Sequence, residues 1–285
     1  HEMYGKHYTM AWPHEEHQSG RPFRCSPLYE ELKSQGACFG EKLGWERPNW
    51  FAPEGVTPED EYSFGEQNWV RYSGDEHRAA REAVAVFDQT SFGKFIVEGA
   101  DSAQALEWIC ANRIDRPVGS VIYTQLLNSR GGIESDLTVT RLAPDRFYLV
   151  TGTGFVTHDY DWIRRSLPES LDVRITDQTD RFAVLSVMGP RSRVLLARVA
   201  SENVGDTALP FASSRQLQVT SSVITAVRLT YVGELGYELH IPIDHALDVY
   251  RALITSGTDL GIRNAGYRAI ESLRLEKGYR AWGSD

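Results

Sequence analysis

The fold is decided by two glycines and the alternating run that follows them, at residues 131–139, which read GGIESDLTV. Consecutive glycines let the backbone reverse tightly between two extended segments. The flanking segments, 121–127 and 137–141, are rich in apolar and β-branched residues and are predicted to be strands. We therefore expect an antiparallel hairpin whose polar end lies next to the turn.

Strands and helices alternate on both sides of this hairpin. In the first half, the spacing of apolar residues predicts strands over 93–97 and 147–151 and helices over 76–86, 102–109 and 158–166, the second of these helices capped by Asp101. In the second half, it predicts strands over 182–188, 227–231 and 237–242 and helices over 192–199, 246–256 and 264–279. Strand–helix–strand units in two similar passes indicate an α+β fold with two related lobes rather than one doubly wound sheet.

The start of the chain differs from the rest. Residues 1–78 contain four of the seven tryptophans, are rich in proline and include one short predicted helix, near 27–32. A segment with so few elements forms no core of its own, and a solvated tail would expose many indole rings. We therefore expect residues 1–78 to lie as an extended arm against a folded domain that spans 79–285.

Composition and charge narrow the classes of function. The 285 residues are 41% hydrophobic and 24% charged, which is typical of a globular chain, and the formal net charge is −9. An acidic balance argues against nonspecific nucleic-acid binding, and no apolar run is long enough to span a membrane. Neither nucleic acid nor membrane is expected as a partner.

Metal and nucleotide motifs are incomplete in this sequence. The three cysteines lack CxxC spacing, and His14 and His17 are three residues apart, whereas a zincin helix needs four. Gly152 and Gly154 lack the third glycine of a dinucleotide fingerprint, and no P-loop occurs. No metal site is predicted, and no flavin, nicotinamide or nucleotide site is predicted within these residues.

Two short stretches carry candidate site residues. Asp136 stands at the mouth of a predicted strand, and Glu134 shares its face, so either could point into a cavity or serve as a turn residue. Residues 231–238, YVGELGYE, place tyrosines and carboxylates around a glycine turn. A carboxylate beside aromatic rings suits a flat heterocycle with an amino group next to a ring N–H. The alternative is an ordinary β-turn with a solvated glutamate.

Four runs resemble the tetrahydrofolate-binding aminomethyltransferase family, also called the glycine-cleavage T-protein family. They occur in the order of that family, at residues 85–95, 131–139, 231–238 and 272–279. Residues 44–51, GWERPNWF, and 266–273, GYRAIESL, are most similar to the branch found in sarcosine and dimethylglycine dehydrogenases. The resemblance implies the folate-binding aminomethyltransferase fold.

The resemblance also implies what lies outside this sequence. In the dehydrogenase branch an N-terminal flavin domain precedes the module, and residues 1–20 resemble the end of the linker that leaves it. FAD would therefore bind upstream, and the barrel that completes the family's fold would begin after Asp285. The expected compartment is the cytoplasm if the source is bacterial and the mitochondrial matrix if it is eukaryotic.

The family's chemistry implies a reaction for this module. The flavin domain of the same polypeptide would oxidise an N-methylated amine to an iminium, and this module would capture the one-carbon unit on tetrahydrofolate. The products would be 5,10-methylenetetrahydrofolate and glycine. The alternatives are a stand-alone glycine-cleavage aminomethyltransferase, which docks a lipoyl carrier protein, and a non-catalytic regulatory module such as that of a phosphatase regulatory subunit.

The resemblance implies roles for the residues of this sequence that occupy the family's motif positions. Asp136 matches the family's catalytic aspartate, and Glu234 matches the glutamate that grips the pterin. Tyr231 and Tyr237 are expected as neighbouring walls, and Tyr123 as a further wall. All five residues lie in or next to the runs quoted above.

Recognition of the anionic folate tail is less direct, because Ile270 stands where the glycine-cleavage pattern has an arginine. The tail would then be bound by Arg268, by Arg274 or by residues outside this sequence. Arg274 is the expected ligand here, with a structural role beside Glu271 as the alternative.

Overall fold

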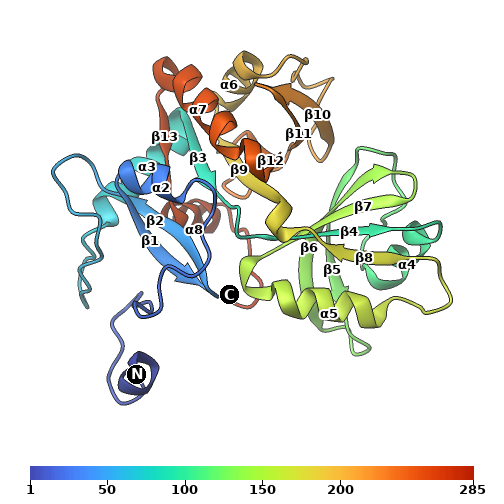
Figure 1. Cartoon of the computed structure of the whole chain (residues 1–285), viewed down its shortest axis with the longest axis horizontal. Helices are drawn as coiled ribbons and strands as arrows, with labels where there is room; N and C mark the ends of the chain where they lie inside the picture. The colour runs from blue at the N-terminus through green and yellow to red at the C-terminus, as the bar shows by residue number, and fades with distance from the viewer.

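The computed structural model describes residues 1–285 and contains two mixed lobes and a separate hairpin (Figure 1). Strands form a six-stranded sheet, a five-stranded sheet and a two-stranded sheet. The predicted α+β fold with two lobes is confirmed, and the sheets are not closed into a barrel. None of the helices combines the length and the apolar character needed to cross a lipid bilayer.

The five-stranded sheet is antiparallel throughout. Its order is β5 (Val121–Leu127), β6 (Ile133–Ala143), β7 (Arg146–Thr151), β4 (Gly93–Glu98) and β8 (Arg174–Asp177). The helices α4 (Ser102–Ile109) and α5 (Val156–Ser166) cover one face, where twelve buried residues form a core cluster. Because side chains alternate along a strand, the other face remains for a site.

The six-stranded sheet holds the largest core. Its order is β10 (Ser214–Val219), β11 (Ser222–Val227), β12 (Gly236–Pro242), β9 (Phe182–Met188), β3 (Val84–Asp88) and β13 (Ile262–Asn264), with β13 and β3 parallel. A cluster of 23 buried residues joins one face to α6 (Ser192–Val199) and α7 (Ala246–Gly257). On the other face, α3 (Val70–Glu82) and α8 (Tyr267–Glu276) contribute to a nine-residue cluster.

The structure also contains five other short elements. The first is α1 (Glu2–Lys6), and the others are the 3-10 helices η1 (Thr153–Phe155), η2 (Thr179–Arg181), η3 (Ile243–His245) and η4 (Thr258–Leu260). None of these carries more than one buried residue. They therefore act as connections between the larger elements.

The segment 1–78 has more secondary structure than the sequence predicts. It contains α2 (Tyr29–Ser34) and a hairpin of β1 (Ala37–Lys42) and β2 (Trp45–Phe51). Trp50 is 0% exposed, its ring stacks on that of Tyr72 with centroids 5.4 Å apart, and its indole N–H donates to Asp60 at 2.7 Å. This hairpin therefore packs into the fold, whereas Trp12 remains 43% exposed.

A buried carboxylate joins the hairpin to the last helix. Glu76 on α3 accepts the backbone N–H of Phe51 at 2.7 Å and that of Gly266, at the start of α8, at 2.8 Å. Burial raises the pKa of Glu76 to about 8. Three segments far apart in the chain therefore meet on one side chain.

Three local predictions are wrong. The helix predicted over 76–86 ends at Glu82, because residues from Val84 onward form β3, which is buried on both faces of the sheet. Residues 228–231 form a loop rather than a strand, and β11 ends at Val227. Asp101 caps no helix with its side chain, since its carboxylate accepts the backbone N–H of Asp172 at 2.8 Å instead.

Replacing Trp50 with Ala tests whether the hairpin is part of the stable core. We expect the free energy of unfolding to fall by about 3–5 kcal/mol, because a fully buried indole leaves a cavity. The measurement is denaturant unfolding followed by circular dichroism. Trp12→Ala is the matched control, with an expected change below about 0.5 kcal/mol for an exposed ring. Equal effects of the two variants would contradict this packing.

Candidate active site

A cavity of about 910 Å³ lies between the two large sheets. The five-stranded sheet contributes side chains from β5, β6 and β7, and the six-stranded sheet contributes one from β12. The rim includes the turn between β1 and β2 and the last residues of the chain, whose end lies between the lobes in Figure 1. The polar and aromatic residues central to the site are Phe92, Tyr123, Asp136, Thr138, Phe155, Tyr231, Glu238 and Trp282.

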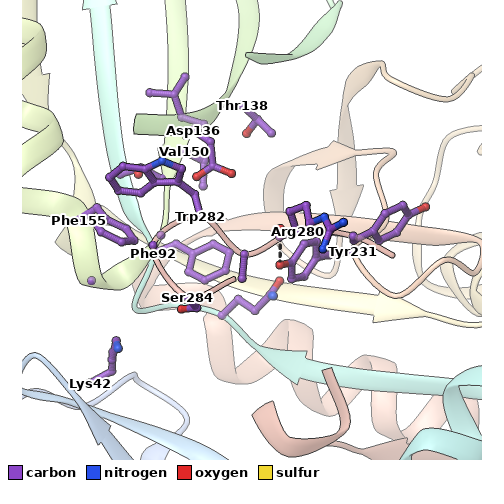
Figure 2. A pocket seen from close by; sticks show the side chains of 18 of the residues that line it. Lys42, Phe92, Asp136, Thr138, Val150, Phe155, Tyr231, Arg280, Trp282 and Ser284 are labelled. Atoms are coloured by element: carbon purple, nitrogen blue, oxygen red, sulfur yellow. Dashed lines mark hydrogen bonds between the residues drawn. The ribbon is translucent and has the colours of Figure 1, made fainter. Parts of the chain in front are cut away.

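Asp136 reaches the cavity because of its place on β6. Leu137 and Val139 belong to the core cluster on the far face, so the alternating residues Asp136 and Thr138 face the cavity (Figure 2). The hydroxyl of Tyr123, on the adjacent strand β5, donates to Oδ2 of Asp136 at 2.7 Å. The predicted placement of both residues at one site is therefore observed.

The surroundings of Asp136 change its acidity. Burial raises the pKa of Asp136, the hydrogen bond from Tyr123 acts in the opposite direction, and the nearby charge of Asp159 raises the pKa further. Desolvation, reinforced by the hydrogen bond to Asp136, raises the pKa of Tyr123 to about 12. Tyr123 therefore stays protonated and remains a donor to the carboxylate at neutral pH.

Glu238 is a further carboxylate of the cavity, to which the sequence motifs assigned no role. It lies on β12, opposite Ser186 of β9, and its side chain is 12% exposed. No protein group donates a hydrogen bond to its carboxylate, and the nearest basic atom is Nε2 of His240 at 3.8 Å. The alternation of residues in this strand indicates the position of Glu238. Tyr237 and Leu239 lie on the core face of the sheet, so Glu238 between them lies on the opposite face.

Glu234 and Tyr237, both expected at the pterin site, are not among the residues that line the cavity. Glu234 lies in the loop before β12, where Nη1 of Arg81 on α3 binds its carboxylate at 3.1 Å. Tyr237 is fully buried in the main core, and its hydroxyl accepts Nε–H of Arg193 at 3.2 Å.

Arg274, the expected ligand of the folate tail, has no free donor toward the cavity. It is 2% exposed and binds Glu271, Asp285 and the carbonyl of Tyr279, the last at 3.0 Å. This matches the structural alternative given for it above. The guanidinium of Arg268 lies 4.8 Å from the centroid of the Trp69 ring, and its Nε and Nη2 are buried without a hydrogen-bond partner.

Aromatic and basic residues complete the walls. Tyr231 lines the cavity, as predicted, and its hydroxyl donates to the carbonyl of Arg280 at 2.9 Å (Figure 2). The rings of Phe155 and Trp282 meet edge to face with centroids 4.7 Å apart. Lys42 is exposed at the rim and forms no ion pair. No group of three or more acidic, His or Cys side chains is arranged to hold a metal ion.

The fold and cavity therefore define an α+β domain in which each large sheet turns one acidic side chain, Asp136 or Glu238, toward one aromatic pocket. The model of the GCVT N-terminal domain matches residues 28–285, so the chain belongs to this aminomethyltransferase family. The model of the FAD dependent oxidoreductase central domain matches residues 1–26. The family resemblance stated from the sequence is thus confirmed.

Individual relatives agree with this assignment. Mitochondrial sarcosine dehydrogenase of Homo sapiens is 39% identical over 323 residues, which cover 100% of this chain and 35% of that protein. Mitochondrial dimethylglycine dehydrogenase of Rattus norvegicus is 38% identical over 286 residues, which cover 100% of this chain and 33% of that protein. The chain therefore spans about a third of the length of these relatives.

A solved structure supports the fold. The glycine cleavage system aminomethyltransferase T from Bartonella henselae superposes with a TM-score of 0.75 at 26% identity, over 91% of this chain and 64% of that chain. The chain is thus an aminomethyltransferase-type domain related to sarcosine dehydrogenase.

Removing the Tyr123 hydroxyl tests the electrostatics of Asp136. Tyr123→Phe takes away a hydrogen bond that favours the ionised carboxylate, so the pKa of Asp136 is expected to rise. Carboxyl chemical shifts followed by NMR during a pH titration measure this. Tyr160→Phe removes a phenol on α5, beyond the far face of the sheet, and is expected to leave the titration unchanged. An unmoved Asp136 titration in Tyr123→Phe would rule out the coupling.

Proposed function

We propose that this domain binds tetrahydrofolate in the cavity and captures on it the one-carbon unit of an N-methylated amine, giving 5,10-methylenetetrahydrofolate. The observation that carries the proposal is the convergence of Asp136 and Glu238, from two different sheets, on one aromatic cavity. Membership of the aminomethyltransferase family supports it. The predicted partner of Asp136 was Glu234, and the proposal replaces it with Glu238.

The residues present suit a reduced pterin. A cavity of about 910 Å³ is in the range of cofactor sites. The Glu238 carboxylate has no donor from the protein, so both oxygens are available for an amino group and an adjacent ring N–H. Tyr231 supplies an apolar wall for a flat ring while its hydroxyl stays bonded to the backbone of Arg280.

Asp136 is proposed as the catalytic carboxylate. Bound tetrahydrofolate would supply the two amines that accept the carbon. Asp136 would stabilise the cationic iminium and transfer one of the two folate N–H protons to the departing amine, while the second N–H proton would leave to solvent, so that Asp136 begins and ends ionised. Burial, which raises the pKa of Asp136, favours such a proton acceptor, and the Tyr123 hydroxyl orients its carboxylate.

The iminium would come from a flavin domain of the same polypeptide, as in a sarcosine-dehydrogenase-type oxidoreductase. The match of residues 1–26 to the FAD dependent oxidoreductase central domain supports this partner. The similarity to sarcosine and dimethylglycine dehydrogenases supports a methylated amino acid as the source of the carbon. FAD would therefore bind outside the cavity described above.

Exchanging the two candidate glutamates distinguishes them. Glu238→Gln places an N–H₂ donor against the donors of the pterin, so we expect the affinity for tetrahydrofolate to fall by about 10-fold or more. Glu234→Gln is the matched control, because Glu234 lies outside the cavity, and its affinity is expected to stay within about 2-fold of the parent. Calorimetric titration under anaerobic conditions measures both. Loss of binding in Glu234→Gln alone would reverse the assignment.

The role of Asp136 is tested in the full-length polypeptide. With Asp136→Asn, reduction of the flavin by the N-methylated amine should continue, while methylenetetrahydrofolate formation falls by about 100-fold or more and free formaldehyde accumulates. Glu134→Gln, two residues earlier on the same strand, is the control, because Glu134 pairs with Asn128 at 2.7 Å instead of lining the cavity. Methylenetetrahydrofolate formed by Asp136→Asn at the parental rate would exclude Asp136 as the catalyst.

A further inference from the structure

We infer that Tyr148 fixes the ring tautomer of His240 so that the ring aims an N–H at Glu238, which makes His240 a positioning residue for the cavity carboxylate. The inference deepens the proposed function and rests on it, because it explains how the proposed pterin ligand is held. No motif in the sequence suggested a part for Tyr148 or His240.

The three side chains form a chain across the junction of the two sheets. Tyr148 comes from β7, in the sheet that carries Asp136, whereas His240 and Glu238 come from β12. The Tyr148 hydroxyl lies 3.1 Å from Nδ1 of His240, and Nε2 of the same ring lies 3.8 Å from Oε2 of Glu238. The two rings meet edge to face at 87° with centroids 5.1 Å apart.

Burial favours one assignment of donor and acceptor in this chain of side chains. Tyr148 is 4% exposed and His240 is 2% exposed, so neither is solvated. Desolvation holds the pKa of Tyr148 well above its ordinary value, so the phenol keeps its proton. Its hydroxyl has no other acceptor, and it therefore donates to Nδ1. In a neutral imidazole whose Nδ1 accepts a hydrogen bond, the proton is on Nε2, which is the nitrogen that faces Glu238.

The position of His240 on β12 gives this N–H its direction. Glu238 and His240 are two residues apart on one strand, so their side chains leave the same face of the sheet. Nε2 lies 3.8 Å from Oε2, which is beyond hydrogen-bond distance, and a small rotation of the carboxylate would bring the two atoms within it. The carboxylate would thereby be held on one side, with its remaining lone pairs facing the cavity.

The Tyr148 hydrogen bond also ties the two sheets together behind the site. Tyr148 lies opposite Thr140 of β6, the strand that carries Asp136. The chain from Tyr148 to Glu238 therefore connects the strand pair that holds one carboxylate to the strand that holds the other. Positioning one ligand against both carboxylates requires a fixed distance between them.

Histidine variants test this positioning against a purely structural role. His240→Leu fills the space without an N–H, and we expect the affinity for tetrahydrofolate to fall by about 10- to 100-fold. His240→Gln carries an amide N–H near the position of Nε2–H, and we expect its affinity to return to within about 3-fold of the parent. Tyr237→Phe is the control, since it removes a buried phenol from the same strand on the core face. Calorimetry measures binding, and thermal unfolding shows that each variant is folded.

Nitrogen-15 NMR of the histidine rings gives a readout that packing alone would not move. We expect His240 to be the Nε2–H tautomer in the parent protein, to become a mixture of tautomers in Tyr148→Phe and to shift its Nε2 signal in Glu238→Gln. An Nδ1–H tautomer in the parent, or His240→Leu binding tetrahydrofolate within 2-fold of the parent, would overturn the inference. If the parent bound no tetrahydrofolate, the proposed function would fail, and the ring spectra would still decide the tautomer.

Discussion

The alternation of side chains on β6 and β12 is the constraint on which the site depends. Each strand buries apolar residues on its core face and thereby turns one carboxylate, Asp136 or Glu238, toward the space between the sheets. Removing a carboxylate from water is costly unless donors replace the lost hydration. Tyr123 donates to Asp136, but no protein group donates to Glu238. The fold therefore creates acceptor capacity inside an aromatic cavity that a ligand rich in N–H groups satisfies.

The two lobes keep this cavity in shape through buried polar contacts at their junction. Lys94 on β4 is fully buried, and its ammonium donates to the carbonyls of Thr90 and Phe182, each at 2.7 Å. Desolvation lowers the pKa of Lys94 to about 7, and the amine donates to these carbonyls in either protonation state. Together with the hydrogen bond between Tyr148 and His240, it joins both sheets without closing the space above Asp136.

The elements predicted most accurately are those whose pattern is local. The strand β9 and the helix α6 have the predicted bounds, because periodicity within seven or eight residues determines them. The sequence pattern did not predict the hairpin of β1 and β2, because Pro48 within β2 is unusual for a strand. In addition, Trp50 of β2 packs against residues that are distant in the sequence. Asp136, Tyr123 and Tyr231, which were expected at the site from their motifs, line one cavity. Glu234 does not, because Arg81, which is 153 residues away in the sequence, binds its carboxylate.

The different surroundings of the two carboxylates explain why the proposed reaction needs both. Asp136 has a raised pKa and a hydroxyl donor that orients it, which suits a group that takes up and releases a proton. Glu238 accepts no hydrogen bond from the protein, and Nε2 of His240 lies 3.8 Å away, which suits a group that binds a ligand and does not exchange protons with it. Exchanging the two environments would place the proton acceptor where the ligand is anchored. The role of each carboxylate therefore depends on whether its strand pair supplies a hydrogen-bond donor. The apolar residues on the core face of each sheet determine how that strand pair is oriented.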